Sequence, residues 1–181
     1  IIGMLGGISI FLGLTPLGII HLPVMNLTIM HIPVIIGAIL EGPLVGGSIG
    51  LIFGLFSMYQ NITAPNLTSF IFMNPMIALL PRILIGIVTY YVYAFIKNKF
   101  KNKSISIGVA SIAGTLTNTI GVLGLTYILY LDRYAAAKQI STDMVAGALL
   151  TVVGTNGIAE AIASAVIAIP VITALSKIRK F

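Results

Sequence analysis

The sequence predicts an all-α integral membrane protein: a six-helix transmembrane bundle with both termini on the cytoplasmic side. Three observations lead to this fold class. Hydrophobic residues make up 58% of the 181 residues and charged residues only 8%, whereas a soluble domain carries about 25% charged residues. The mean hydropathy is +1.11, and the apolar residues come in long runs. The basic residues collect at the ends of these runs, as orientation signals do.

This composition excludes several classes of protein. A soluble fold of this length needs polar residues to cover its surface, so soluble enzymes and nucleic-acid-binding domains are excluded despite the net charge of +6. Cysteine is absent, which excludes a disulfide framework and a thiolate metal site. There is no cleavable signal pattern. We therefore expect a lipid bilayer, and no nucleic acid, as the surroundings of this chain.

Six apolar runs are expected to be the spans of one transmembrane domain over residues 1–181. They are Ile1–Leu14, Ile32–Leu40, Leu44–Met58, Met76–Ile96, Ile105–Leu131 and Val145–Leu175. A span needs roughly 20 apolar residues. The first run opens without an initiator Met, so we expect residues ahead of Ile1. The second is short and ends at the Glu41-Gly42-Pro43 break, where a re-entrant hairpin is the alternative. The sixth is too long, so it tilts, bends near Pro170 or emerges as a tail.

The charges predict the orientation of these spans. Lys97, Lys99, Lys101 and Lys103 share one short loop, and Lys177, Arg179 and Lys180 lie at the C-terminus. The positive-inside rule makes both groups cytoplasmic, and the two spans between them agree with that. Counting backwards puts the N-terminus inside. The loops Thr15–Met30 and Tyr59–Ser69 then lie outside, as does the loop with Asp132, Arg133, Lys138 and Asp143.

Small residues repeat every four positions on three of the runs. Helices in lipid gain little from apolar burial, so close backbone packing must hold them together. Gly46, Gly50 and Gly54, and likewise Gly157, Ala161 and Ala165, are expected to be contact seams within the bundle. Gly3 and Gly7 form the same device on the first run. Because that helix carries few polar residues, its seam can equally face another protein.

Arg82 is the most informative polar residue, since a charge within a span is expensive. Asn74-Pro75 predicts a helix start, with Asn as the N-cap and Pro at the first helical position. Arg82 then lies about 10 Å below the outer end, within reach of outside water. Two interpretations stay open. Arg82 is a cation that binds a substrate carboxylate or phosphate, or it pairs internally with Glu160 or with backbone carbonyls.

Three further polar residues fall near the middle of their spans. Asn156 and Glu160 are one turn apart and share a helix face. Asn118 lies at a similar depth on the preceding span, between Thr115 and Thr119. Together with Arg82, these residues would converge on a polar cavity. The alternative is a structural polar clamp that only ties the helices together.

The outer loop Thr15–Met30 is apolar and contains Pro16 and Pro23, so we expect it to fold back onto the bundle, where it could close over a site. Asn26, Thr28 and His31 are its candidate ligand-binding residues. His21 and His31 lack a nearby carboxylate or Cys partner, so no metal site is expected. The chain contains no phosphate-binding GxxxxGK[ST] loop, no HExxH and no nucleophile elbow. It is not expected to be an enzyme or to hold a cofactor.

The chain resembles the membrane substrate-binding subunit (S component) of energy-coupling factor (ECF) vitamin transporters. The resemblance rests on six short spans, a long apolar first outer loop and a small-xxx-small first helix. It also rests on the run His31-Ile-Pro-Val-Ile-Ile-Gly-Ala-Ile-Leu-Glu-Gly-Pro43, the glycine ladder after it, Asn74-Pro75 and Leu80-Pro-Arg82. It covers essentially the whole chain.

The resemblance implies a function and partners. Such a subunit, in the bacterial cytoplasmic membrane, captures a vitamin from outside and docks on a transmembrane scaffold subunit that carries two ATPases. The family docks through an Ala-xxx-Ala motif on the first helix, where this chain has Gly3 and Gly7. The family's site, built from the first outer loop and helices four to six, matches Arg82, Asn118, Asn156 and Glu160. Asn74, Asn26, Thr28 and His31 complete the expected set.

The substrate is expected to be pantothenate, because a buried Arg favours an anion, and amides and hydroxyls favour a ligand rich in such groups. The Leu80-Pro-Arg82 run also resembles pantothenate-type members. Riboflavin, biotin or a folate remains the alternative within the family. Outside it, the alternatives are a structural membrane protein and a small channel-like oligomer.

Overall fold

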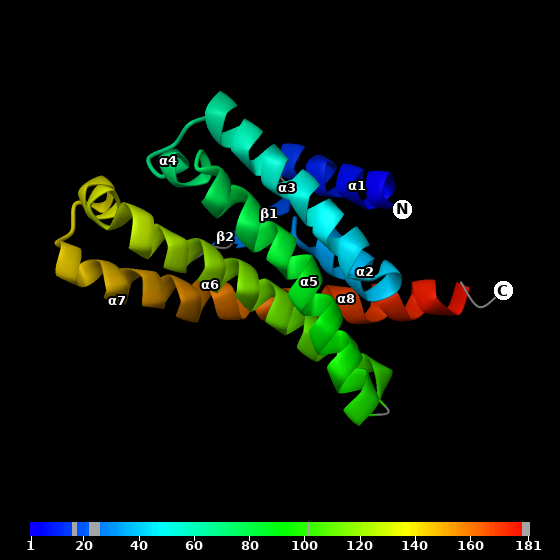
Figure 1. Cartoon of the computed structure of the whole chain (residues 1–181). Helices are drawn as coiled ribbons and strands as arrows, with labels where there is room; N and C mark the ends of the chain where they lie inside the picture. Colours follow the sequence, from blue (N-terminus) through cyan, green and yellow to red (C-terminus); the bar gives the residue numbers. More distant parts are fainter. Residues whose placement is uncertain (16–17, 22–25, 101, 179–181) are drawn as a thin grey trace.

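The computed structural model describes residues 1–15, 18–21, 26–100 and 102–178 as a bundle of long helices with one small hairpin (Figure 1). The elements are α1 (Ile2–Leu14), β1 (Ile19–His21), β2 (Asn26–Thr28), α2 (Ile32–Glu41), α3 (Pro43–Thr63), α4 (Ser69–Phe72), α5 (Pro75–Lys99), α6 (Lys103–Lys138), α7 (Thr142–Val152), the π-helical turn η2 (Val153–Gly157) and α8 (Ile158–Ile178). Pro16, Pro23, Lys101, Arg179 and Lys180 lie outside the described residues.

Each of the six predicted spans coincides with a helical segment. Within the described residues, four helices are long and apolar enough to cross a membrane: α3, α5, α6 and the continuous α7–η2–α8. The other two are shorter, 13 residues in α1 and 10 in α2. The helical bundle is therefore confirmed, whereas the count of six spans stays a prediction. All residues of α2 from Ile32 to Ile39 are buried, so this short helix lies inside the bundle.

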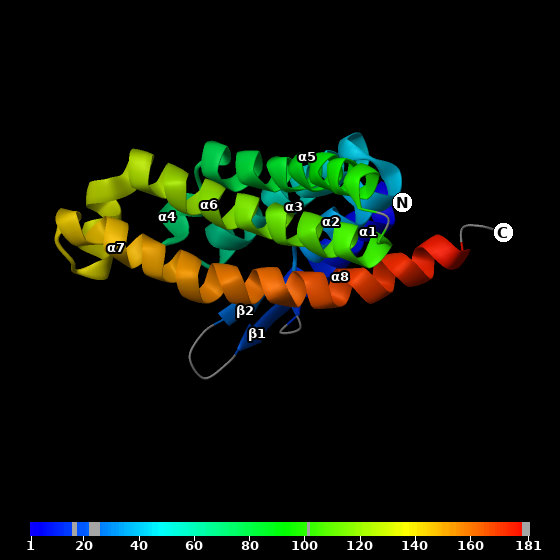
Figure 2. The same ribbon diagram turned by 90° about the horizontal axis from the view of Figure 1, so that it is seen from below.

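Two predicted loops contain regular structure. Residues 132–138 continue α6, which bends at Tyr130 (φ −135°, ψ 28°) and then ends at Lys138. The expected loop around Asp132 is therefore wrong, since Ala135, Ala136 and Ala137 are strong helix formers. Between α1 and α2, in the loop predicted to lie outside, β1 and β2 pair antiparallel, with Ile20 opposite Leu27. The fold is thus helical with one small hairpin, which lies beside α8 (Figure 2).

Glycines allow α3 and α5 to pack backbone against backbone. A Cβ at Gly50 would overlap the Arg82 carbonyl, and one at Gly86 would overlap the Gly46 backbone. A Cβ at Gly46 would lie 2.6 Å from that of Ala38 on α2. The predicted seam on the third span is therefore confirmed. It fixes α5, and with it Arg82, directly against α3.

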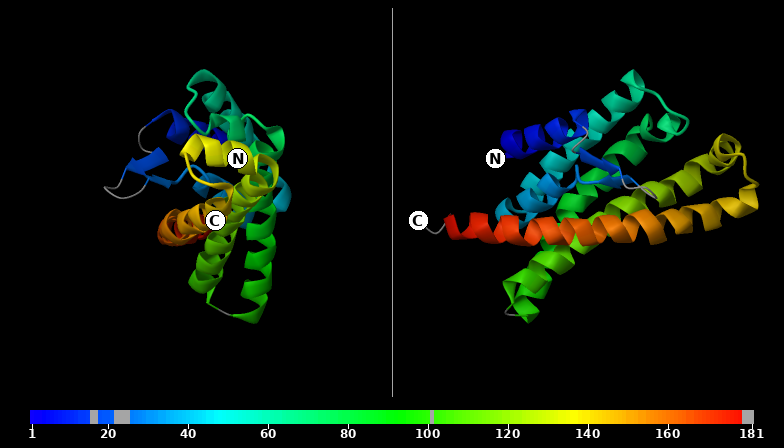
Figure 3. Two further views of the ribbon diagram at one scale, coloured as in Figure 1. Left: turned by 90° about the vertical axis from the view of Figure 1, so that its left-hand side faces the viewer. Right: turned by 180° about the vertical axis from the view of Figure 1, so that it is seen from behind.

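Two ends of the bundle can be distinguished. The N-terminus, the turn between α2 and α3, the α5–α6 connection and the end of α8 gather at one end (Figures 1 and 3). The connections from α3 to α5 and from α6 to α7 lie at the other. The α2–α3 turn is made at Gly42, whose φ of +103° and ψ of 176° suit glycine alone. Pro43 then starts α3.

Candidate functional site

A polar stripe on α6 faces the interior of the bundle. Ser111, Thr115, Thr119 and Thr126 are all buried, and their spacing of four, four and seven residues puts them on one helix face. Each of these hydroxyls donates to the carbonyl of its own helix four residues earlier. Such bonds satisfy the hydroxyl protons and leave the oxygen lone pairs for other donors. The stripe is therefore a row of acceptors.

His31 binds this stripe from the N-terminal end of α2. Its ring is 1% exposed, and Nε2 lies 3.0 Å from Thr115 Oγ1. We assign the ring proton of His31 to Nε2, as the donor to Thr115, because the Thr115 hydroxyl donates to the Ser111 carbonyl at 2.9 Å. Nδ1 is then an acceptor, and it is buried with no hydrogen-bond partner. His31 therefore offers one unused acceptor inside the bundle.

Ser164 on α8 joins the same network. Its Oγ accepts from the Thr115 hydroxyl at 2.9 Å, a proton that Thr115 shares with the Ser111 carbonyl, and its own hydroxyl donates to the Ala161 carbonyl at 2.9 Å. The side chain is fully buried. Sequence reasoning did not include Ser164 in the site, although it lies four residues after Glu160 and so shares its helix face. That spacing was the available signal.

Glu160 ties α8 to the hairpin. The backbone N–H of Thr28 in β2 donates to Glu160 Oε1 at 2.8 Å. The expectation that the outer loop folds back onto the bundle is confirmed by this bond. The backbone of Asn26 pairs with His21 at the start of β2, and its side chain is outside the described part of the structure. Thr28 and Glu160, two of the candidate site residues, are thus brought together.

Asn156 lies in η2, one turn before Glu160. A π-helical turn is rare and occurs frequently at functional sites. The Thr155 hydroxyl donates to Asn156 Oδ1 at 3.2 Å. Next to it, Gly157 allows the close approach of α6, since an added Cβ would lie 3.1 Å from Thr119. Asn118, also on α6, has its amide oxygen buried without a hydrogen-bond partner.

Arg82 is buried but is not paired with Glu160. Its Nη1 donates to the Ile77 carbonyl at 2.8 Å, so the backbone-carbonyl interpretation is confirmed and the salt bridge is wrong. The guanidinium lies 5.5 Å from the ring centre of Phe53 and 5.1 Å from that of Phe72. Its Nε has no hydrogen-bond partner. In the described part of the chain no carboxylate lies within ion-pair distance of Arg82.

The physical reason is the position of α4. This short helix places Phe72 against Arg82, and α3 supplies Phe53 from the other side. The rings of Phe53 and Phe72 contact the Arg82 guanidinium, which the sequence alone would have allowed to pair with the Glu160 carboxylate. No periodic pattern in the sequence marks these aromatic partners.

Asn74 has a structural role at the start of α5. Its Oδ1 accepts from the Met76 N–H at 2.9 Å, which confirms the predicted N-cap. Its Nδ2 donates to the Tyr130 hydroxyl at 3.1 Å. Asn74 therefore joins the start of α5 to the bend of α6, and its bonds do not reach the network of His31.

Gly3 and Gly7 lie on an open face of α1. Both are exposed, and an added Cβ at either position would meet nothing within 4 Å. The opposite face of α1 packs inward, where the Ser9 hydroxyl donates to the Met30 carbonyl at 3.3 Å. The small-residue seam of α1 is therefore not used inside the described part of the bundle.

Comparison with known proteins identifies the family of the chain. Residues 1–172 match the family described as ECF transporter, substrate-specific component. Pantothenic acid transporter PanT of Lactococcus lactis is 33% identical over 148 residues, which cover 74% of this chain and 69% of the relative. Pantothenate transporter PanT of Leuconostoc mesenteroides is 31% identical over 120 residues, covering 65% of this chain and 59% of the relative. The chain belongs to the family of substrate-specific components of ECF transporters.

Proposed function

We propose that this chain captures pantothenate from the outer side of the bacterial cytoplasmic membrane and delivers it to an ATP-driven ECF module. The proposed substrate rests on the similarity of this chain to two transporters named for pantothenate. The module is proposed from the family, because the chain itself has no phosphate-binding loop for ATP. Hydrolysis would then take place on two ATPase subunits attached to a scaffold subunit.

The chemistry of the site supports an anionic, hydroxyl-rich ligand. Arg82 carries a buried positive charge without a carboxylate partner in the described residues, and an anion near it would recover part of the desolvation cost. His31 Nδ1 and Asn118 Oδ1 are buried acceptors without partners, which suit hydroxyl or amide N–H donors. Pantothenate offers one carboxylate, one amide and two hydroxyls. We infer that its carboxylate lies toward Arg82 and its polar chain toward His31 and Asn118.

Glu160 and Asn156 are proposed to line the same site from α8 and η2. Glu160 holds the hairpin through Thr28, so the hairpin would cover the bound ligand. The ligand would enter from, and leave to, the water outside when the hairpin moves away. This assignment uses the orientation with six spans and both termini inside. It puts the α3–α5 and α6–α7 connections outside and the lysines near the α5–α6 connection in the cytoplasm.

The first experiment is mass spectrometry of small molecules released from the detergent-purified protein. We expect pantothenate near one molecule per chain. Calorimetric titration of ligand-free protein then compares pantothenate with pantothenol, in which an alcohol replaces the carboxylate, and with riboflavin and biotin. Tight binding of pantothenate alone supports the proposal. Binding of another vitamin would keep the family and reject the substrate.

A structural clamp is the rival function for the same polar residues. If the purified protein is monodisperse, releases no small molecule and binds none of these vitamins, the polar network serves only to hold the helices. The proposal then fails at the level of function as well as substrate.

A further inference from the structure

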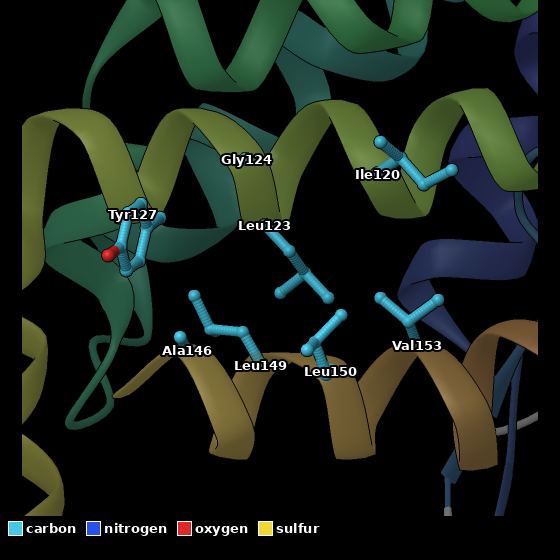
Figure 4. Close-up of a pocket in the computed structure, with 8 residues that line it drawn as sticks. All are labelled: Ile120, Leu123, Gly124, Tyr127, Ala146, Leu149, Leu150 and Val153. Atoms are coloured by element: carbon cyan, nitrogen blue, oxygen red, sulfur yellow. The ribbon is translucent and has the colours of Figure 1, made fainter. Parts of the chain in front are cut away.

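A groove runs along the surface of the bundle between α6 and α7 and has a volume of about 590 Å³ (Figure 4). From α6 it is lined by Ile120, Leu123 and Gly124, and from the facing side by Leu149, Leu150 and Val153. On both sides the positions recur every three or four residues, so each helix presents one apolar face. The groove is therefore built by two facing apolar stripes.

The lining of the groove does not suit a vitamin. Tyr127 is the one lining side chain that carries a polar atom, and Ala146 completes the set. None of the residues of the candidate substrate site takes part. The lining is also accessible at the surface of the protein, since the exposed fraction of the side chain is 70% for Leu150 and 57% for Ile120. The chemistry of this surface thus favours a hydrocarbon chain.

Gly124 gives the groove its depth. A Cβ at this position would meet nothing within 4 Å, so neither packing nor backbone conformation of the bundle requires glycine there. A larger side chain would instead project into the groove. Gly147 on α7 has equally open surroundings but does not line the groove.

A second hollow of about 600 Å³ shares Tyr127 with the groove as a lining residue and extends to Arg133. It follows the bend of α6 at Tyr130. Arg133 is exposed, and its guanidinium lies 4.5 Å from the ring centre of Phe70. Asp132 also lines this hollow. Tyr and Arg at the end of an apolar surface are typical of the membrane–water interface, and Arg pairs readily with phosphate.

We propose that the α6–α7 groove binds a phospholipid, with an acyl chain along Ile120 to Tyr127 and the phosphate beside Arg133. The apolar groove and the cation at its end match the two halves of such a molecule. The proposal depends on insertion of the chain in a membrane. It does not depend on which vitamin is bound.

The test compares Gly124→Leu with Gly147→Leu. Both variants add the same side chain at an open position, but only the first fills the groove. Each protein is purified in mild detergent with added phosphatidylglycerol, and bound lipid is counted by native mass spectrometry. We expect Gly124→Leu to retain at least tenfold less lipid than the wild type and Gly147→Leu to match the wild type. Arg133→Gln should weaken retention of phosphatidylglycerol while leaving the groove open.

Equal lipid retention by wild type and Gly124→Leu overturns the proposal. So does a Gly124→Leu variant that keeps its lipid but no longer co-purifies with its transporter partners, because the groove would then be a protein interface. If Gly124→Leu is not monodisperse, Ala146→Leu fills the same groove from α7 and carries the same expectation. Pantothenate titration of these variants is expected to be unchanged, so failure of the substrate proposal is distinguishable from failure of this one.

Discussion

Arg82 has an unusual set of partners for a cation buried in a membrane protein. One backbone carbonyl and the faces of Phe53 and Phe72 surround it. Each ring face stabilises a desolvated cation by about 2 kcal/mol or more, which offsets part of the several kcal/mol that removing an ion from water costs. None of these partners carries a negative charge, so an anionic ligand would stabilise the cation further.

Replacing Arg82 with Gln keeps a hydrogen-bond donor and removes the charge. We expect the affinity for pantothenate to fall about 30-fold or more, because losing one partner of a buried charge pair costs about 2–5 kcal/mol. Affinity for pantothenol should change little. Calorimetric titration of both ligands against both proteins measures the difference. A variant that still prefers the acid over the alcohol as strongly as the wild type would place the carboxylate elsewhere.

The hydroxyl of Thr115 is the centre of the His31–Ser164 network. Thr115→Val preserves the shape of the side chain and leaves the buried Nε2–H of His31 without an acceptor. We expect a loss of about 1–3 kcal/mol in the free energy of unfolding, seen as a lower Tm in detergent. Thr117→Val is the matched control, since among the residues that the structure describes the Thr117 hydroxyl bonds within its own helix, to the Ala113 carbonyl. Equal effects of the two substitutions would contradict the network.

At the scale of elements, the α3–α5 contact holds Arg82 in place and depends on glycines, which have no side chain to separate the two backbones. Gly50→Ala would push a methyl group into the Arg82 carbonyl. Overpacking of this kind costs about 1–3 kcal/mol, so we expect a lower Tm and weaker pantothenate binding. Gly47→Ala is the control on the same helix, because its Cβ would lie at an ordinary 3.7 Å from Ile83. If both variants melt together, the seam does not limit stability.

At the scale of the whole molecule, the open seam of α1 is the proposed surface for the ECF scaffold. Gly3→Leu combined with Gly7→Leu leaves the described interior untouched, since neither position has a neighbour within 4 Å. We expect pantothenate binding to stay at the wild-type level while co-purification with the scaffold and uptake are lost. Gly147→Leu adds bulk at another open position and should keep both. Normal uptake by the double variant would move the docking surface away from this face.

Much of the fold could be predicted from the apolar runs, because span length and glycine spacing are local properties. The end of α6 was predicted wrongly, because the charges of Asp132, Arg133 and Lys138 favoured a loop, whereas the three alanines between them continue the helix. The hairpin was also missed. Its strands are three residues each, too short for an alternating pattern to stand out.

The candidate site could be predicted in part. Intramembrane polar residues marked Arg82 and Glu160 as groups that need partners, but the bond between the Thr28 backbone and Glu160 could not be predicted, because it depends on how the hairpin folds back. The direction of the Arg82 side chain was not predictable, since it depends on how α4 brings Phe72 over it. Ser164 was overlooked because a single serine in a span commonly bonds its own helix. It does so here, and also contacts Thr115.

The backbone of the turn between α2 and α3 distinguishes an L-residue from a D-residue at position 42. With φ at +103° and ψ at 176°, Gly42 adopts the mirror image of an ordinary extended residue. The space around it is open, so size does not exclude a side chain. Handedness does, at about 1–3 kcal/mol for an L-residue. A D-alanine introduced by chemical synthesis would suit the backbone of this turn, while L-alanine would strain the junction on which the buried α2 and its His31 cap depend.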